Sequence, residues 1–143
     1  MTNLAQIISD AEQGDASAQY NLGVMYRDGE GVPQDDEIAI KWFILAAEQE
    51  YAPAQNNLGV MNETGHGVPQ DYEIAVKWYT LAAEQEHASA QYNLGVMYRR
   101  GEGVPQDDET AEKWFTLAVE QGDTDALKNL FLLKAERRGL ITP

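Results

Sequence analysis

Apolar residues follow the period of an α-helix along most of the chain, in paired segments separated by short polar turns. The first segment of each pair has apolar residues at i, i+4, i+7 and i+8, which form one apolar helix face. In the first pair these residues are Ala18, Leu22, Met25 and Tyr26. The second segment alternates aromatic residues with alanines, and in the first pair these are Ala39, Trp42, Phe43, Ala46 and Ala47. The pattern predicts amphipathic helices packed in pairs, with the aromatic rings in the core.

The paired segments occur three times. A shift of 36 residues superimposes residues 15–50, 51–86 and 87–122, and the first and third copies differ at only seven positions. A period of this length indicates supersecondary units that stack on one another. We therefore predict an all-α solenoid of antiparallel helix pairs, with about eight helices in one domain over residues 1–143.

A turn rich in glycine separates the two segments of each pair. In the first copy it reads Gly29-Glu30-Gly31-Val32-Pro33-Gln34-Asp35, and it recurs at residues 65–71 and 101–107. Glycine ends a helix readily in the left-handed region, and proline cannot continue one. The last residue of each turn is an aspartate, whose side chain suits the free amides of the next helix. Each turn therefore predicts a helix hairpin.

The two ends of the chain carry altered half-units. Residues 2–14 align with a second segment but place Gln6 where the tryptophan occurs, and residues 123–138 align with a first segment. In that last segment Phe131 replaces the glycine found in all three copies. Glycine lets a neighbouring helix approach closely, so its loss indicates that no further repeat follows. We predict an N-terminal half-repeat cap at 2–14, repeats at 15–50, 51–86 and 87–122, and a C-terminal capping helix at 123–138, which favours a complete array over a fragment of a larger scaffold.

The last segment has more apolar residues than one helix stripe needs. They are Leu127, Leu130, Phe131, Leu132 and Leu133. The excess needs a cover, either from the tail residues Leu140 and Ile141 or from a second chain. We expect the tail to fold back, so a monomer is favoured over a homodimer formed through this helix.

Three motifs recur in register in all three copies. They are Ala-Gln-Tyr-Asn-Leu-Gly-Val-Met-Tyr, Gly-x-Gly-Val-Pro-Gln-Asp and Ala-x-Lys-Trp-Phe/Tyr-x-Leu-Ala, with a few substitutions in the middle copy. Over residues 2–137 the chain resembles the Sel1-like repeat family, a relative of the tetratricopeptide repeats. The resemblance implies a right-handed superhelix with the first helices on a concave face. It also implies a scaffold or adaptor that binds proteins or peptides, as in many bacterial members, some of which are linked to penicillin binding or hydrolysis.

The chain departs from the family pattern at two kinds of position. Glu50 and Glu86 stand where a helix-ending glycine is usual, so either these helices end differently or a non-glycine residue carries strain of about 1 kcal/mol or more. The middle copy also differs, because Asn62 replaces a tyrosine and Glu63-Thr64 replaces Arg27-Asp28 and Arg99-Arg100.

Composition limits the classes of partner. The formal net charge is −14, from 24 acidic and 10 basic residues, which disfavours nucleic acid and anionic membranes as partners. The acidic field favours a basic protein partner, although the acidic side chains can equally be a solvated surface. No cysteine, no basic leader and no long apolar segment occur. This predicts a soluble protein with no disulfide, cytoplasmic, or periplasmic or secreted if a signal was removed.

Residues suited to catalysis are sparse. His66 lies in a turn and His87 begins a helix, and neither has a repeated carboxylate or histidine at ligand spacing beside it. The Ser-x-x-Lys motif of serine β-lactamases is absent. We therefore predict no enzyme activity, no cofactor and no metal.

The flanks of the first helices are the predicted partner surface. An asparagine recurs there in every copy, and it could bind the backbone of an extended peptide or satisfy carbonyls of inter-repeat turns. The candidate residues are Tyr20, Asn21, Asn57, Asn62, Glu63, Tyr92, Asn93, Arg99, Arg100, Lys128 and Asn129. We predict an adaptor or scaffold that binds a protein or peptide on the concave face. The alternative is an immunity or inhibitor protein that neutralises a toxin or enzyme.

Overall fold

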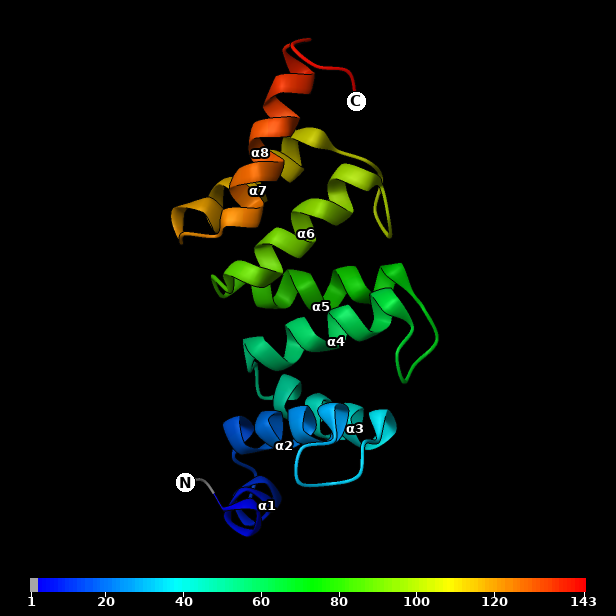
Figure 1. The fold of residues 1–143 in the computed structure, drawn as a ribbon, viewed down its shortest axis with the longest axis vertical. Coiled ribbons are helices and arrows are strands. Elements are labelled where there is room, and N and C mark those ends of the chain that lie inside the picture. The colour runs from blue at the N-terminus through cyan, green and yellow to red at the C-terminus, as the bar shows by residue number, and fades with distance from the viewer. Residues whose placement is uncertain (1–2) are drawn as a thin grey trace.

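The structure is a computed structural model that describes residues 3–143, and all regular structure in these residues is helical. Figure 1 shows the helices stacked in chain order along the long axis of the molecule, with the two termini at opposite ends. The eight described helices are α1 (Leu4–Glu12), α2 (Ala16–Asp28), α3 (Asp36–Glu48), α4 (Ala52–Thr64), α5 (Tyr72–Glu84), α6 (Ala88–Arg100), α7 (Asp108–Glu120) and α8 (Thr124–Arg137).

Each helix packs mainly against its neighbours in sequence. The closest pairs are α2 with α3, α4 with α5 and α6 with α7, and successive pairs meet through α3 with α4 and α5 with α6. Contacts that stay between adjacent units are the defining property of a solenoid. The predicted all-α solenoid of helix pairs is therefore confirmed.

The turn inside each pair forms as its residues predict. Gly29 ends α2 in the left-handed region, with φ 70°, and its N–H donates to the Met25 carbonyl. Asp35 then precedes α3, and its Oδ1 accepts a hydrogen bond from the Ile38 N–H at 3.0 Å. The same two features recur at the other turns. Gly65 and Gly101 end α4 and α6, and Asp71 and Asp107 cap the starts of α5 and α7.

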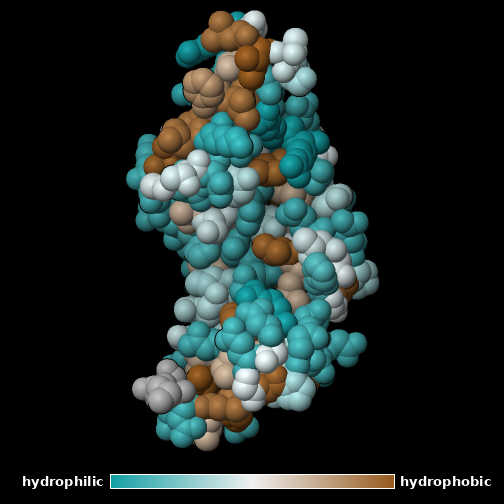
Figure 2. All heavy atoms as spheres, in the orientation of Figure 1, coloured by the Kyte–Doolittle hydropathy of each residue, from teal (hydrophilic) through white to brown (hydrophobic). Residues whose placement is uncertain are grey.

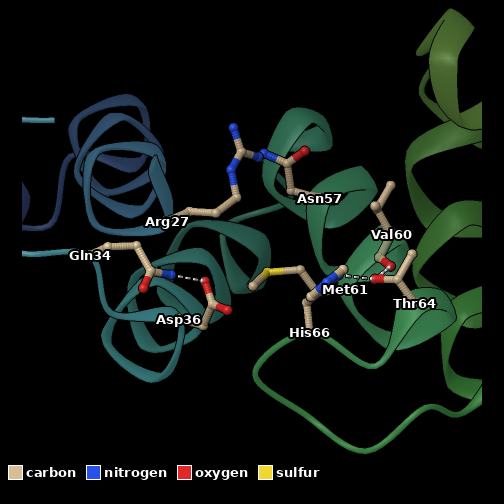
Figure 3. A pocket seen from close by; sticks show the side chains of 8 residues that line it. All are labelled: Arg27, Gln34, Asp36, Asn57, Val60, Met61, Thr64 and His66. Carbon is tan, nitrogen blue, oxygen red and sulfur yellow. Dashed lines mark hydrogen bonds between the residues drawn. The ribbon is translucent and has the colours of Figure 1, made fainter. Parts of the chain in front are cut away.

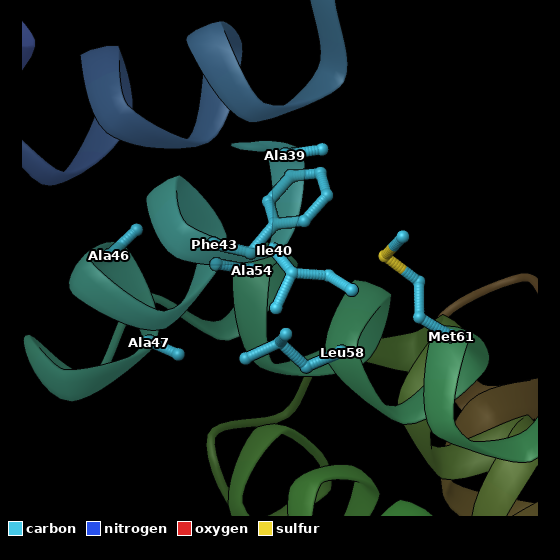
Figure 4. Close-up of a cluster of buried hydrophobic side chains, with 8 residues drawn as sticks. All are labelled: Ala39, Ile40, Phe43, Ala46, Ala47, Ala54, Leu58 and Met61. Carbon is cyan, nitrogen blue, oxygen red and sulfur yellow. The ribbon is translucent and has the colours of Figure 1, made fainter. Parts of the chain in front are cut away.

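The hydrophobic core is a chain of small clusters, one at each junction. In the cluster drawn in Figure 4, Phe43 of α3 is fully buried and packs with alanines of its own helix and with Leu58 and Met61 of α4. The Phe43 ring lies against Gly23 of α2, where an added Cβ would be 2.6 Å from a ring carbon. Glycine at this position thus allows the second helix of the same repeat to pack closely against the first.

Two core predictions are wrong in detail. Trp42, Trp78 and Trp114 are half-buried, because each lies on the flank of its helix and packs on the cluster of the preceding junction. Met25 and Tyr26 are also only half-buried, whereas Met61 and Met97 are buried. For Met25 the cause is α1, which has 9 residues where the other second helices have 13 and so covers less of α2, whereas Tyr98 is half-buried like Tyr26.

A ladder of glutamines crosses the helix pairs. Gln55 of α4 is 2% exposed, and its Nε2 donates to the Ala47 carbonyl at 3.2 Å while its Oε1 accepts from Gln85 Nε2 at 2.7 Å. Gln19 and Gln91 make the equivalent bonds in the other repeats. Buried amides need partners, so each glutamine fixes the spacing of three helices.

Glu50 and Glu86 do adopt the left-handed conformation, with φ 62° and 64°. The helices before them therefore end as they would with glycine, and the strain predicted for a non-glycine residue is present.

The C-terminal tail does not cover α8. The Leu140 N–H donates to the Ala135 carbonyl, yet Leu140 stays 72% exposed and Phe131 stays 70% exposed. The prediction that the tail folds back over this helix is wrong, because the chain turns away after Gly139 (φ 72°). Figure 2 shows hydrophobic side chains gathered at this end of the molecule. None of the helices in residues 3–143 is long and apolar enough to cross a membrane.

Candidate functional site

The four asparagines of the first helices do not form a uniform row. Asn21 is exposed, and Asn93 donates from Nδ2 to Asn56 Oδ1 at 3.1 Å. Asn129 donates to the Asp125 carbonyl of its own helix. Asn57 is half-buried, and its Nδ2 has no hydrogen-bond partner within residues 3–143. None of the bonds that these side chains make within the described residues reaches an inter-repeat turn.

Of the distinctive residues of the middle repeat, Asn62 and Glu63 face inward and Thr64 is exposed. Asn62 is only 8% exposed, and its Nδ2 donates to the Leu58 carbonyl at 2.8 Å. Glu63 accepts a hydrogen bond from the Tyr79 hydroxyl at 2.7 Å, and burial together with this carboxylate raises the pKa of Tyr79. Asn62 is therefore unavailable to a partner, and the change to Glu63 accompanies the change from phenylalanine to Tyr79.

The basic candidates lie near the C-terminal end of the array. Arg99 donates from Nη2 to Glu136 Oε1 at 2.7 Å and from Nη1 to Asn129 Oδ1 at 3.4 Å. Arg100 and Lys128 are exposed. The junction between repeat three and α8 is thus closed by an internal ion pair.

Tyr20 and Tyr92 occupy matching positions in repeats one and three, and both are half-buried. Each stacks at a tilt on the buried phenylalanine of its own repeat, with ring centroids 5.9 Å apart for Tyr20 and Phe43 and 6.0 Å for Tyr92 and Phe115. Part of each tyrosine ring therefore packs in the hydrophobic core.

A pocket of about 320 Å³ lies between repeats one and two, and we call it the junction pocket. Figure 3 shows its lining side chains, with Arg27 of α2 and Asn57 of α4 extending toward each other. The lining residues are Arg27, Gln34, Asp36, Asn57, Val60, Met61, Thr64 and His66. Of the residues predicted from sequence to bind a partner, only Asn57 lines it.

Hydrogen bonds already occupy part of the polar lining. Arg27 donates from Nε and Nη2 to the two carboxylate oxygens of Asp28, at 2.9 and 3.2 Å. The Thr64 hydroxyl donates to the Val60 carbonyl and also lies 2.8 Å from His66 Nδ1. Because the hydroxyl hydrogen is used, His66 Nδ1 must carry a proton and donate to Thr64. The outer edge of Arg27 makes no hydrogen bond within residues 3–143, and the enclosed Asn57 amide lies beside it.

Comparison with known families decides what kind of chain this is. The Sel1 repeat model matches residues 16–51, 52–87 and 88–123, which is most of the chain. The chain belongs to the Sel1 repeat family. Sel1 repeats are protein–protein interaction modules, and proteins built from them are typically non-catalytic.

Solved structures of Sel1 repeat proteins share the fold. A protective antigen of uropathogenic Escherichia coli with an SLR fold is 42% identical, with a TM-score of 0.89 over 91% of this chain and 28% of that chain. The Sel1 chain described here therefore spans little more than a quarter of the antigen's length.

Two further bacterial structures are comparable in size to this Sel1 chain. A Sel1 repeat protein from Oxalobacter formigenes is 40% identical, with a TM-score of 0.83 over 89% of this chain and 96% of that chain. Cysteine-rich protein B of Helicobacter pylori is 21% identical, with a TM-score of 0.70 over 89% and 91%, and shows the fold alone. Among curated protein sequences, none matches this one.

Metal ligands do not gather in the described part of this Sel1 protein. Within residues 3–143 no group of three or more histidine, aspartate or glutamate side chains could hold a metal ion. His87 stands alone at the start of α6, where burial lowers its pKa.

Proposed function

We propose that this Sel1 repeat chain is a non-catalytic adaptor that captures a partner protein by binding an extended peptide segment on its first-helix surface. This surface consists of the outward-facing side chains of α2, α4, α6 and α8. It corresponds to the concave face that the family resemblance implies. The junction pocket is the observation that supports the proposal most, because two successive repeats contribute to it and leave hydrogen-bond donors unused.

The first-helix surface suits a peptide in three further respects. Val60, at the rim of the junction pocket, is 38% exposed and offers an apolar contact beside the polar donors. A peptide lying across several repeats would gain affinity from each, in the way that solenoids generally use extended surfaces. The array also changes shape little on binding, since each repeat is fixed to the next by its core and glutamine contacts.

Affinity capture from the native host, followed by mass spectrometry, tests the proposal. The variant Val60→Arg places a long charged side chain on the first-helix surface. The matched control Leu81→Arg makes the same kind of change on α5, where the leucine is 46% exposed. We expect Val60→Arg to lose the captured partner and Leu81→Arg to retain it. Equal capture by both variants would show that the first-helix surface is not the binding site.

A further inference from the structure

The repeat places the same arginine at two junctions, and only one of them is closed. Arg27 and Arg99 occupy equivalent positions, 72 residues apart, near the ends of α2 and α6. Across from Arg99, α8 supplies Asn129 and Glu136; across from Arg27, α4 supplies Asn57 and Thr64 at the equivalent positions. Thr64 therefore stands where the other junction has a carboxylate.

The closed junction shows which edge of the arginine faces the next repeat. Arg99 uses Nη1 and Nη2, the outer edge of the guanidinium, for Asn129 and Glu136. Arg27 uses Nε and Nη2 for Asp28, which leaves Nη1 and the outer hydrogen of Nη2. Asp28 therefore orients Arg27 from the side and leaves the edge that Glu136 engages at the other junction.

The unused edge of Arg27 lies at the junction pocket. Arg27 and Asn57 both line it, and Asn57 Nδ2 has no partner within the described residues. A carboxylate in the pocket would accept from the outer edge of Arg27, the edge that Glu136 engages at the other junction, whereas Asn57 Nδ2 is enclosed. The volume of about 320 Å³ lies at the lower end of the range for small ligand sites.

We propose that the junction pocket binds a carboxylate of the partner's peptide segment, in the position that Glu136 takes beside Arg99. This inference rests on the proposed peptide-binding function and names the chemistry of the ligand. Val60 and Met61 form the apolar side of the pocket and contact the carbon chain that carries the carboxylate.

Charge restricts the ligand further. Asp36 also lines the pocket, where Gln34 holds one of its oxygens at 2.8 Å, and the whole chain has a formal net charge of −14. A segment with several acidic residues would be repelled. The segment therefore carries one carboxylate among neutral or basic residues, which also agrees with an acidic surface that favours a basic partner.

The carboxylate has two possible sources, the C-terminus of a chain or a glutamate or aspartate side chain, and three probe peptides distinguish them. The first is acetyl-Lys-Ala-Leu-Ala with a free C-terminal carboxylate, the second is its C-terminal amide, and the third is the amide with glutamate in place of leucine. Each is titrated into the ¹⁵N-labelled full chain, and the NMR signals of the Arg27 Nε–H and the Asn57 side-chain amide are followed. We expect saturable shifts with the first or the third peptide and at least about tenfold weaker binding of the second. Equal binding of all three, or no shift with any, overturns the inference.

A substitution tests the same point from the protein side. Thr64→Glu gives the pocket an internal carboxylate where Glu136 stands at the other junction, so it should weaken binding of the carboxylate peptide by about tenfold or more. Ser89→Glu adds the same charge at an exposed position of α6 and is the matched control, expected to bind as the unmodified chain does. If Thr64→Glu binds the peptide as well as Ser89→Glu does, the inference fails. If Thr64→Glu retains the partner while Val60→Arg loses it, the inference fails and the proposed adaptor function stands.

Discussion

Replacing Glu50 and Glu86 by glycine should stabilise the solenoid. Both residues have left-handed backbone conformations, with φ 62° and 64°. At the end of α3 the Glu50 N–H donates to Ala47 and the Tyr51 N–H donates to Ala46, so the residue at this position must adopt that conformation for both bonds to form. Glycine reaches it without the clash that a Cβ makes.

The size of the gain follows from two opposing terms. The left-handed conformation costs a non-glycine residue about 1–2 kcal/mol. Glycine also makes the unfolded chain more flexible, and this lowers the free energy of unfolding by about 0.4–1 kcal/mol, which offsets part of the gain. Neither glutamate side chain makes a hydrogen bond or ion pair within residues 3–143, and both are exposed, so no contact is lost. We expect a net gain of about 0.5–1 kcal/mol per site, or about 1–2 kcal/mol for the double variant.

Urea denaturation followed by circular dichroism measures this gain as a higher midpoint at an unchanged slope. The thermal midpoint should rise by about 3–6 °C for the double variant. Glu50→Gln and Glu86→Gln remove the same charges while keeping the strain, so they separate the two effects. Glu48 and Glu84 are the last residues of α3 and α5, where glycine gains nothing from a left-handed conformation, so Glu48→Gly and Glu84→Gly should each lose up to about 1 kcal/mol. A double glycine variant no more stable than the double glutamine variant would refute the reasoning.

Three further substitutions test separate parts of the structure. His87→Asp should add a helix cap worth about 1 kcal/mol, because α6 begins without a side-chain cap whereas Asp15 caps the nearly identical α2; urea denaturation at pH 7 checks it. Burial lowers the pKa of His87 in the folded chain. As the pH falls through about 6.5, the unfolded chain therefore protonates this histidine before the folded chain does, and the unmodified protein should lose stability. His87→Asp should not show this loss. Gln55→Leu should cost about 1–3 kcal/mol in the same assay, because it removes two hydrogen bonds, one to the Ala47 carbonyl and one from Gln85. Gly59→Ala should cost about 1–3 kcal/mol, because the new Cβ would lie 2.4 Å from the Tyr79 ring, and an unchanged thermal midpoint would contradict that contact.

The fold could be predicted from sequence because its determinants are local and occur three times. The turn glycines, the capping aspartates and the alanine-rich stripes each act within one helix pair, so the period alone identifies them. The glutamine ladder was missed, since Gln55 is polar and lies beside the apolar stripe, and a helical wheel does not show the carbonyl that it reaches. Its recurrence at one position in every repeat was the available signal.

The candidate site was harder to predict because it depends on pairs of positions in adjacent repeats. Aligning the repeats compares Arg27 with Glu63 and Arg99, yet the contacts that matter join residues 30 and 37 apart, such as Arg99 with Asn129 and with Glu136. A column of the alignment therefore shows which residue varies but not what it faces. Comparing each position with the one 37 residues later shows the arginine opposite glutamate at one junction and threonine at the other.

The three junctions of this Sel1 solenoid are closed by different side chains. At the middle junction Glu63 is engaged by Tyr79, and Asn93 is engaged by Asn56. At the last junction Arg99 is engaged by Glu136 and Asn129. At the first junction Arg27 and Asn57 lack such a partner, although their positions in the repeat are the same. Stacking requires the repeated residues at every junction, so under the proposed function specificity would come from unrepeated residues, of which Thr64 is one.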